Sequence, residues 1–184
     1  MALRGSRDSG AKGSLRIVES SDIGDDRLCL DGLAEVAVQP GARTEAHLLR
    51  PFDILVTARS HAVKAALVPP EVSRTVAAVT LLVVRTPDPG NGLAHFLWYY
   101  LTSTRGRAEV ASRLTATSMP TLSARALGEV PVAVPPASEL RRLADLIDAA
   151  EASRAAALEA VRVRHDVLRD ALLSACTPEG SAGR

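Results

Sequence analysis

Aromatic residues are scarce in this chain, since Phe, Trp and Tyr make up 3% of its 184 residues. Aliphatic side chains must therefore supply most of any core, and an apolar fraction of 47% is sufficient for one. Lysine is almost absent, because only Lys12 and Lys64 occur among 22 basic residues. The net charge of +1 excludes a histone-like polycation but leaves a local basic face open.

Cysteine, metal-binding patterns and long apolar runs are also lacking. Cys29 and Cys176 lie at opposite ends of the chain, which excludes a disulfide-rich scaffold and a zinc finger and predicts no metal site. No apolar run approaches the roughly 18 residues of a membrane span, and residues 1–14 lack the apolar segment of a signal peptide. We therefore expect a cytoplasmic protein without a membrane association.

Signatures of catalysis are missing as well. The sequence has no Gly-rich nucleotide-binding pattern, no His-Glu-x-x-His and no nucleophile elbow. Ser60 and His61 could be a nucleophile and a base, but adjacent residues in a tight hairpin rarely face each other, and no third group is evident. An Asn-Pro-Pro-Tyr motif for adenine methylation does not occur either. We predict that the chain is not an enzyme and has no catalytic residues.

Short apolar runs that alternate with turn residues predict a β-rich first region. Strands are expected at 15–18, 35–38, 53–58, 64–68, 75–85 and 130–134. The run 75–85 is continuous and β-branched, so we expect one strand buried on both faces. Helical spacing appears at 94–103 and 107–114, with Gly106 as the expected interruption, and a turn with a short helix at 119–127. The expected fold class is α+β.

One long helix is predicted to follow Pro135 and Pro136, because neither Gly nor Pro occurs again before Pro178. From Ser138 to Ala175 it would be about 57 Å long. Its apolar residues recur at a spacing of three or four and are Leu140, Leu143, Ile147, Ala150, Leu158, Val161, Leu168 and Leu172. Such a stripe predicts a second long helix from another chain, as in a coiled coil. The expected division is a domain at 1–135, a spacer and dimerisation helix at 136–177 and a flexible tail at 178–184.

Polar and basic residues gather in the expected loops, where a rigid β scaffold commonly presents binding groups. One group follows the strand at 53–58 and the others lie in separate loops; the candidates are Arg59, Ser60, His61, Lys64, Arg43, Thr44, Arg113, Thr115, Thr117 and Ser118. Arg and Lys contact phosphates and guanine edges, and Ser and Thr donate to phosphate oxygens. These side chains predict a DNA-binding surface, and ordinary solvated loops are the alternative.

Five segments carry a family resemblance when they are taken in order along the chain. These segments are LLRPFDILVTARSHAVKAALVPP (48–70), VAAVTLLVVR (76–85), AHFLWYYLTSTRGRAEV (94–110), LTATSMPTLSARALGEVPVAVPP (114–136) and SELRRLADLID (138–148). In this order they resemble the specificity subunits of type I restriction–modification systems. The resemblance extends over about residues 15–175. The chain departs from the family pattern at Phe52 and Ser60, where the family commonly has Gly, and at Leu140, where it has Gln.

The resemblance implies a target recognition domain followed by one spacer helix, in a phage-defence system that methylates DNA at bipartite sites. It implies double-stranded DNA, a methyltransferase subunit and a restriction subunit as partners. The chain itself would hold no cofactor; S-adenosylmethionine belongs to the methyltransferase partner, and ATP and Mg to the restriction partner. One recognition domain and one spacer, where a full subunit has two of each, predict a homodimer or a pair with a second half-subunit.

Two other functions remain open at this stage. The chain could be the DNA-reading module of another modification system, or a protein–protein adaptor that has kept the fold and lost contact with DNA. The near-neutral charge favours the adaptor, and the polar loop residues favour a DNA reader.

Overall fold

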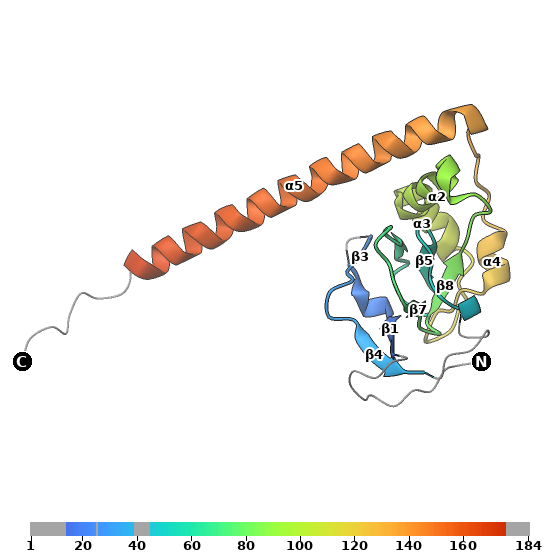
Figure 1. The fold of residues 1–184 in the computed structure, drawn as a ribbon, viewed down its shortest axis with the longest axis horizontal. Coiled ribbons are helices and arrows are strands. Elements are labelled where there is room, and N and C mark those ends of the chain that lie inside the picture. The colour runs from blue at the N-terminus through green and yellow to red at the C-terminus, as the bar shows by residue number, and fades with distance from the viewer. Residues whose placement is uncertain (1–13, 25, 39–44, 176–184) are drawn as a thin grey trace, which may run out of the picture. The chain divides into compact units, whose positions relative to one another are not determined.

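The computed structural model describes residues 14–24, 26–38 and 45–175 (Figure 1). The chain divides into two compact units between Ala144 and Asp145. This division lies inside the long C-terminal helix, two turns after its start. The functional boundary expected between residues 135 and 136 remains a prediction, and the tail at 178–184 lies outside the described residues.

The described strands all belong to the first unit, and most are short. They are β1 (Ser14–Val18), β2 (Ile23–Gly24), β3 (Arg27–Leu28), β4 (Ala34–Ala37), β5 (Ile54–Thr57), β6 (Ala65–Leu67), β7 (Thr75–Ala77) and β8 (Leu81–Val84). Two single-turn helices, η1 (Ser20–Asp22) and η2 (Pro89–Asn91), lie in the connections. The strands form three small sheets.

The central strand of the third sheet, β5, organises the first unit. It pairs antiparallel with both β6 and β8, and all four of its residues are buried. In the first sheet β1 pairs antiparallel with β4 and parallel with β7, and β2 and β3 form a small antiparallel ribbon. One core cluster between these elements is aliphatic, as the scarcity of aromatics predicts, and contains Val18, Ile23, Leu33, Leu49, Leu55, Ala66, Val68 and Leu81.

Two consecutive helices, α2 (Leu93–Thr102) and α3 (Thr104–Ala111), follow the third sheet. The helical conformation is interrupted between them at Ser103. The Ser103 hydroxyl accepts a hydrogen bond from the Gly106 N–H and caps α3. The expectation that Gly106 interrupts the helix is therefore wrong. Gly106 is needed for a different reason, because a Cβ atom there would lie 2.0 Å from the Tyr100 carbonyl oxygen.

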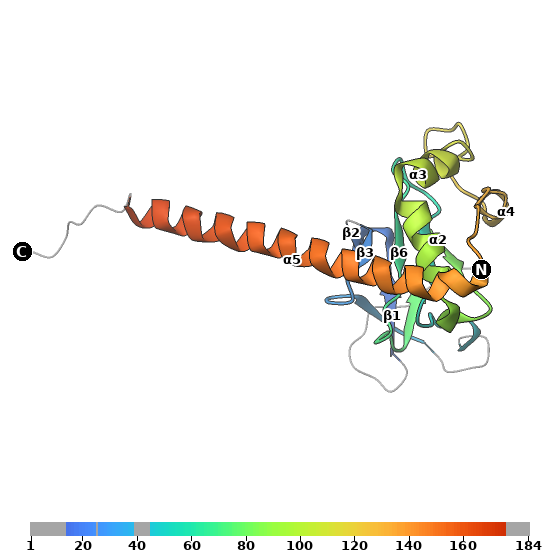
Figure 2. The same cartoon turned by 90° about the horizontal axis from the view of Figure 1, so that it is seen from above.

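Helix α2 lies beside β6 (Figure 2). The indole N–H of Trp98 donates to the carbonyl oxygens of Asp26 and Ala65, at 3.2 and 3.4 Å, and so fixes α2 to two segments that are distant in the sequence. At the start of α2, Gly92 has φ +87°, and a Cβ there would lie 2.4 Å from the Leu140 carbonyl oxygen. A glycine at this position therefore allows the first turns of α5 to pack closely.

Two strand predictions fail. The segment 75–85 is not one strand but two, β7 and β8, which belong to different sheets and are separated by a turn at 79–80. Val79 is 71% exposed in that turn. The composition of this β-branched run does not indicate that the chain turns within it. Residues 130–134 are not a strand either, since they form no sheet pairing and follow the short helix α4 (Ala124–Gly128) as an irregular segment.

The long helix α5 (Ala137–Ala175) confirms the expectation of one uninterrupted C-terminal helix, and with the sheets it confirms the α+β class. In the second unit its surface carries ion pairs at helical spacing, including Arg162 with Glu159 at 2.6 Å. The hydrogen bond from Arg162 lowers the pKa of Glu159. Within the residues that the structure describes, no helix is both long and apolar enough to cross a membrane.

Candidate nucleic-acid interface

The loop between β5 and β6, residues 58–64, is tightly closed. The Thr57 N–H donates to the Lys64 carbonyl oxygen at 3.0 Å, and the Lys64 N–H donates to the Thr57 hydroxyl at 3.1 Å. Within the loop, the Ser60 hydroxyl accepts a hydrogen bond from the Ala62 N–H at 3.1 Å. This loop is therefore a fixed hairpin end, and the Ser60 oxygen stabilises its turn.

A second loop, residues 112–121, lies directly beside this hairpin end. Arg59 and Thr121 form an antiparallel bridge, and the Leu122 N–H donates to the Ala58 carbonyl oxygen at 2.8 Å. Leu122 is buried, so its side chain holds the second loop against the first unit. The structure thus joins two groups of candidate residues that are about 50 positions apart in the sequence. We call residues 58–64 and 112–121 together the two-loop surface.

Threonine side chains brace the second loop from within. The Thr121 N–H donates to the Thr115 hydroxyl at 3.0 Å, and the Thr117 hydroxyl donates to the Met119 carbonyl oxygen at 2.7 Å. The Thr121 hydroxyl donates to the same carbonyl oxygen at 3.2 Å. Because these hydroxyls bond within the loop, they fix its shape.

Two of the basic candidates also make contacts inside the fold. The ammonium group of Lys64 donates to the Ile23 carbonyl oxygen at 2.9 Å. The guanidinium of Arg113 pairs with Glu109 at 3.0 Å and donates to the Glu129 carbonyl oxygen at 3.2 Å. Both side chains are partly buried, and both tie the two-loop surface to neighbouring elements.

Other candidate side chains on this surface point to solvent. Arg59, His61 and Ser118 make no side-chain hydrogen bond or ion pair with any described residue, and Arg59 and His61 stand on the braced hairpin end. Met119 is an exposed apolar residue next to Ser118. Arg43 and Thr44, the remaining candidates, lie outside the described residues.

The predicted contact residues of the long helix separate into two groups. Leu140 and Ile147 are buried in the single chain, and Leu143 is half-buried. Farther along, the residues at the expected spacing are each more than half exposed, namely Leu158, Val161, Leu168 and Leu172; Ala150 is exposed as well. An exposed apolar stripe therefore occupies the second half of α5, whereas Leu140 and Ile147 near its beginning are buried.

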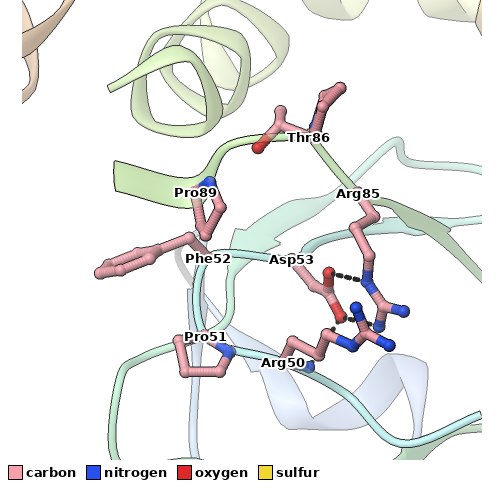
Figure 3. Close-up of a pocket in the computed structure, with 8 residues that line it drawn as sticks. Arg50, Pro51, Phe52, Asp53, Arg85, Thr86 and Pro89 are labelled. Carbon is pink, nitrogen blue, oxygen red and sulfur yellow. Dashed lines mark hydrogen bonds and ion pairs between the residues drawn. The ribbon is translucent and has the colours of Figure 1, made fainter. Parts of the chain in front are cut away.

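A charged cluster at the opposite end of β5 escaped prediction. The Asp53 carboxylate is 1% exposed and accepts hydrogen bonds from Arg85 Nε at 2.7 Å, Arg85 Nη2 at 2.6 Å and the Arg50 N–H at 2.8 Å (Figure 3). The hydrogen bond to Asp53 raises the pKa of Arg85. Asp53 stands directly before β5 and Arg85 directly after β8, so the pair extends the register in which Ile54 faces Val84. The sequence signal that could have predicted this pair is an acidic residue next to one apolar strand and a basic residue next to another.

The turn before this cluster explains the departure at Phe52. Residues 50–53 close with a hydrogen bond from the Asp53 N–H to the Arg50 carbonyl oxygen at 3.1 Å, with Pro51 in the second position. Phe52 has φ +65°, a conformation that favours glycine, and its ring lies 4.9 Å from the ring of His95. The backbone at residue 52 thus has the conformation that a glycine adopts most easily. The contact between the Phe52 and His95 rings offsets part of the backbone strain that a phenylalanine has there.

Comparison with solved structures finds a similar fold. The crystal structure of the HsdS subunit from Thermoanaerobacter tengcongensis matches this chain with a TM-score of 0.55 and 21% sequence identity. The match covers 93% of this chain and 45% of the HsdS chain, so this chain spans less than half the length of that protein. No protein-family model and no curated protein matches.

The fold of this chain is HsdS-like. Because the match covers 93% of the chain, it includes both the β-rich unit and most of the long helix. Among the described residues, no group of three or more His, Cys, Asp or Glu side chains is arranged to hold a metal ion. The two-loop surface presents to solvent the hydrogen-bonding side chains of His61 and Ser118, the guanidinium of Arg59 and the thioether of Met119.

Proposed function

We propose that this chain is a non-catalytic DNA-recognition subunit of a type I restriction–modification system, and that the two-loop surface reads the base sequence. The observation that carries the proposal is the junction of the two loops, which places the Arg59 side chain in solvent on a braced backbone. The HsdS-like fold supports it, since HsdS is the specificity subunit of such systems. The five sequence segments resemble the same family.

The chemistry of the surface suits readout in the major groove. An arginine guanidinium offers two parallel N–H donors to O6 and N7 of guanine, and this contact discriminates best when the backbone below it does not move. Arg59 meets both conditions, because its guanidinium has no described partner and its backbone bridges Thr121. Ser118 would donate to a phosphate, and Met119 would contact a thymine methyl group or an apolar base edge.

The remaining candidates receive a supporting role in this proposal. Thr115 and Thr117 shape the loop that carries Ser118 and Met119, and their hydroxyls already have acceptors within it. Lys64 and Arg113 hold the two loops to the rest of the unit through carbonyl oxygens. Their substitution would lower DNA affinity by loosening the loops, without changing preference at any single base pair.

The exposed stripe on α5 supports pairing with a second long helix. Leu158, Val161, Leu168 and Leu172 follow one another at intervals of three, seven and four residues, so they share one face of the helix. Leaving these side chains in water is unfavourable by roughly 25 cal/mol for each Å² that a partner could cover. The partner is a second copy of this chain or a different half-specificity subunit, and a symmetric pair would favour a symmetric, interrupted DNA site.

The methyltransferase partner carries out the reaction in this scheme. Its S-adenosylmethionine supplies the methyl group, and the target adenine must leave the duplex because its reactive nitrogen is inaccessible inside the stack. This chain fixes which adenine is presented by setting the register on flanking base pairs.

The experiment is a selection of binding sites from a random duplex library with the full chain and with Arg59→Ala. If Arg59 reads a guanine through two hydrogen bonds, its loss weakens binding by about 1–3 kcal/mol and relaxes the preference at one position. Arg105→Ala is the matched control, because Arg105 is an exposed arginine on α3, outside the two-loop surface. The control should leave the selected sequence unchanged. An Arg59→Ala variant with the same affinity and the same selected sequence as the parent chain would refute the assignment.

A further inference from the structure

A shallow pocket lies at the end of β5 that is remote from the two-loop surface. Residues 50–53 lead into β5 and residues 85–89 follow β8. Because these strands are antiparallel, the two segments meet at the same end of the sheet. The two-loop surface begins where β5 ends, at residue 58. The pocket is lined by Arg50, Pro51, Phe52, Asp53, Arg85, Thr86, Pro87 and Pro89 (Figure 3).

The floor of the pocket is fixed by the buried Asp53 carboxylate. Arg85 holds it with two donors, and a third Arg85 hydrogen bond reaches the Leu48 carbonyl oxygen at 3.0 Å. The Arg85 side chain is nevertheless 34% exposed, so one edge of its guanidinium remains open to an incoming group. This arginine cannot reorient without breaking three hydrogen bonds, and its position in the pocket is therefore set in advance.

A second guanidinium in the lining, that of Arg50, has no acidic partner among the described residues. The Arg50 backbone N–H donates to Asp53, but the Arg50 side chain makes no hydrogen bond or ion pair with any described residue. Arg50 and Arg85 both line the pocket, and their side chains are drawn with the Asp53 carboxylate in Figure 3. Asp88, the nearby acid in the following turn, accepts a hydrogen bond from the Gly90 N–H and does not line the pocket. The residues that line the pocket thus include two arginines and one carboxylate, which Arg85 already pairs with.

Apart from Thr86, whose hydroxyl donates to the Asp88 carbonyl oxygen at 3.5 Å, the remaining lining is apolar and stiff. Three prolines contribute to it, and each has a fixed φ angle and no N–H to offer a ligand. Phe52 is held by its contact with the His95 ring. A phosphate site in a nucleic-acid interface usually combines a cation with several backbone N–H and hydroxyl donors. Here three lining residues are prolines without an N–H, and the Thr86 hydroxyl already donates to the Asp88 carbonyl oxygen.

We propose that this pocket binds an acidic side chain, Asp or Glu, of a protein partner. The carboxylate would complete the charge balance of Arg50 and Arg85, and a guanidinium receives a carboxylate with two parallel hydrogen bonds. The prolines and Phe52 would cover the aliphatic stem of the acidic residue. Arginine and aromatic residues are enriched in the cores of protein interfaces, which agrees with this lining. The proposal is independent of DNA recognition, because the pocket and the two-loop surface lie at opposite ends of β5.

The test uses amide and arginine side-chain NMR signals of the full chain. The probe is N-acetylglutamate N-methylamide, and its neutral counterpart is N-acetylglutamine N-methylamide. The glutamate probe should shift the Asp53 and Thr86 amide signals and the Arg85 Nε signal, and the glutamine probe should leave them in place. Arg50→Gln should weaken the binding of the glutamate probe about tenfold, which corresponds to one charge-assisted hydrogen bond.

Arg105→Gln is the control, since it removes the same charge from an exposed site outside the pocket and should keep the response of the parent chain. Inorganic phosphate and a short duplex DNA form the second arm of the titration. The proposal is overturned if the glutamate probe produces no shifts, or if the glutamine probe produces the same ones. It is also overturned if phosphate or duplex DNA displaces the glutamate probe from the pocket, because the pocket would then be a nucleic-acid contact.

Discussion

Replacing Asp53 with Asn should destabilise the first unit more than any other single isosteric change in it. The substitution preserves the shape of the side chain and removes the charge that accepts three hydrogen bonds, two from Arg85 and one from the Arg50 N–H. The amide has one acceptor oxygen, and its NH₂ group would face the donors of Arg85. At least one guanidinium donor therefore loses its partner in a place where Asp53 itself is 1% exposed.

The magnitude follows from the burial of the two partners. Breaking a fully buried ion pair costs about 3–5 kcal/mol, because the remaining charge is left uncompensated. Arg85 is 34% exposed and can recover part of its hydration, so the lower end of that range applies. We expect a loss of about 3 kcal/mol, or a fall in Tm of about 6–12 °C for a chain of this size.

Urea unfolding followed by circular dichroism at neutral pH measures the effect, with the DNA-binding assay as a separate readout. Asp31→Asn is the control, because Asp31 is exposed and the same chemical change there should stay within about 0.5 kcal/mol. Asp53→Leu combined with Arg85→Met should cost less than the sum of the single changes, since the orphaned charge is removed. An Asp53→Asn variant as stable as the parent chain would show that the carboxylate does not hold β5 and β8 in register.

Three further predictions test other parts of the structure. Gly106→Ala should destabilise the chain by about 2 kcal/mol in urea unfolding, because the new Cβ would lie 2.0 Å from an α2 carbonyl oxygen. Gly128→Ala is the control, since a Cβ there has open space and the change should be neutral or stabilising. Phe52→Gly should be about 1 kcal/mol more stable than Phe52→Ala, the reverse of the usual order, because φ is +65° there; equal stabilities would argue against the strained turn. If the helix partner is a second copy of this chain, Val161→Glu should shift sedimentation from dimer to monomer, and Val163→Glu, about 200° farther round the helix, should not. A parent chain that sediments as a stable monomer at micromolar concentration would contradict pairing between two copies and leave a different half-subunit as the partner.

Prediction from the sequence succeeds where one local signal dominates. The absence of Gly and Pro from 137 to 175 predicts α5 to within one residue of its observed start, since nothing else in the chain competes with helix formation there. The hairpin of β5 and β6 is likewise local, because a polar loop separates two short apolar runs. The long-range bridge between Arg59 and Thr121 is different: each loop can be predicted alone, but their contact depends on the buried Leu122 and on the whole third sheet.

Prediction fails where a turn lies inside a run of strand-forming residues, and where the role of a polar side chain depends on contacts that only the fold creates. Residues 75–85 form one β-branched run, and the turn inside it is made by Val79 and Thr80, neither of which is a typical turn residue. Thr115 and Thr117 are plausible phosphate ligands by residue type, yet their hydroxyls bond inside the loop. Asp53 and Arg85 are 32 positions apart, and only the antiparallel register of β5 and β8 brings them together.

The salt dependence of duplex DNA binding tests the central claim most directly. Binding through phosphates and a base-reading arginine releases counterions, so the logarithm of the association constant should fall linearly with the logarithm of salt concentration. Arg59→Ala should bind more weakly at every salt concentration, and Arg105→Ala should retain the base preference of the parent chain. Affinity that does not change with salt, or the absence of duplex binding at low salt by the assembled chain, would contradict a DNA-reading role for the two-loop surface.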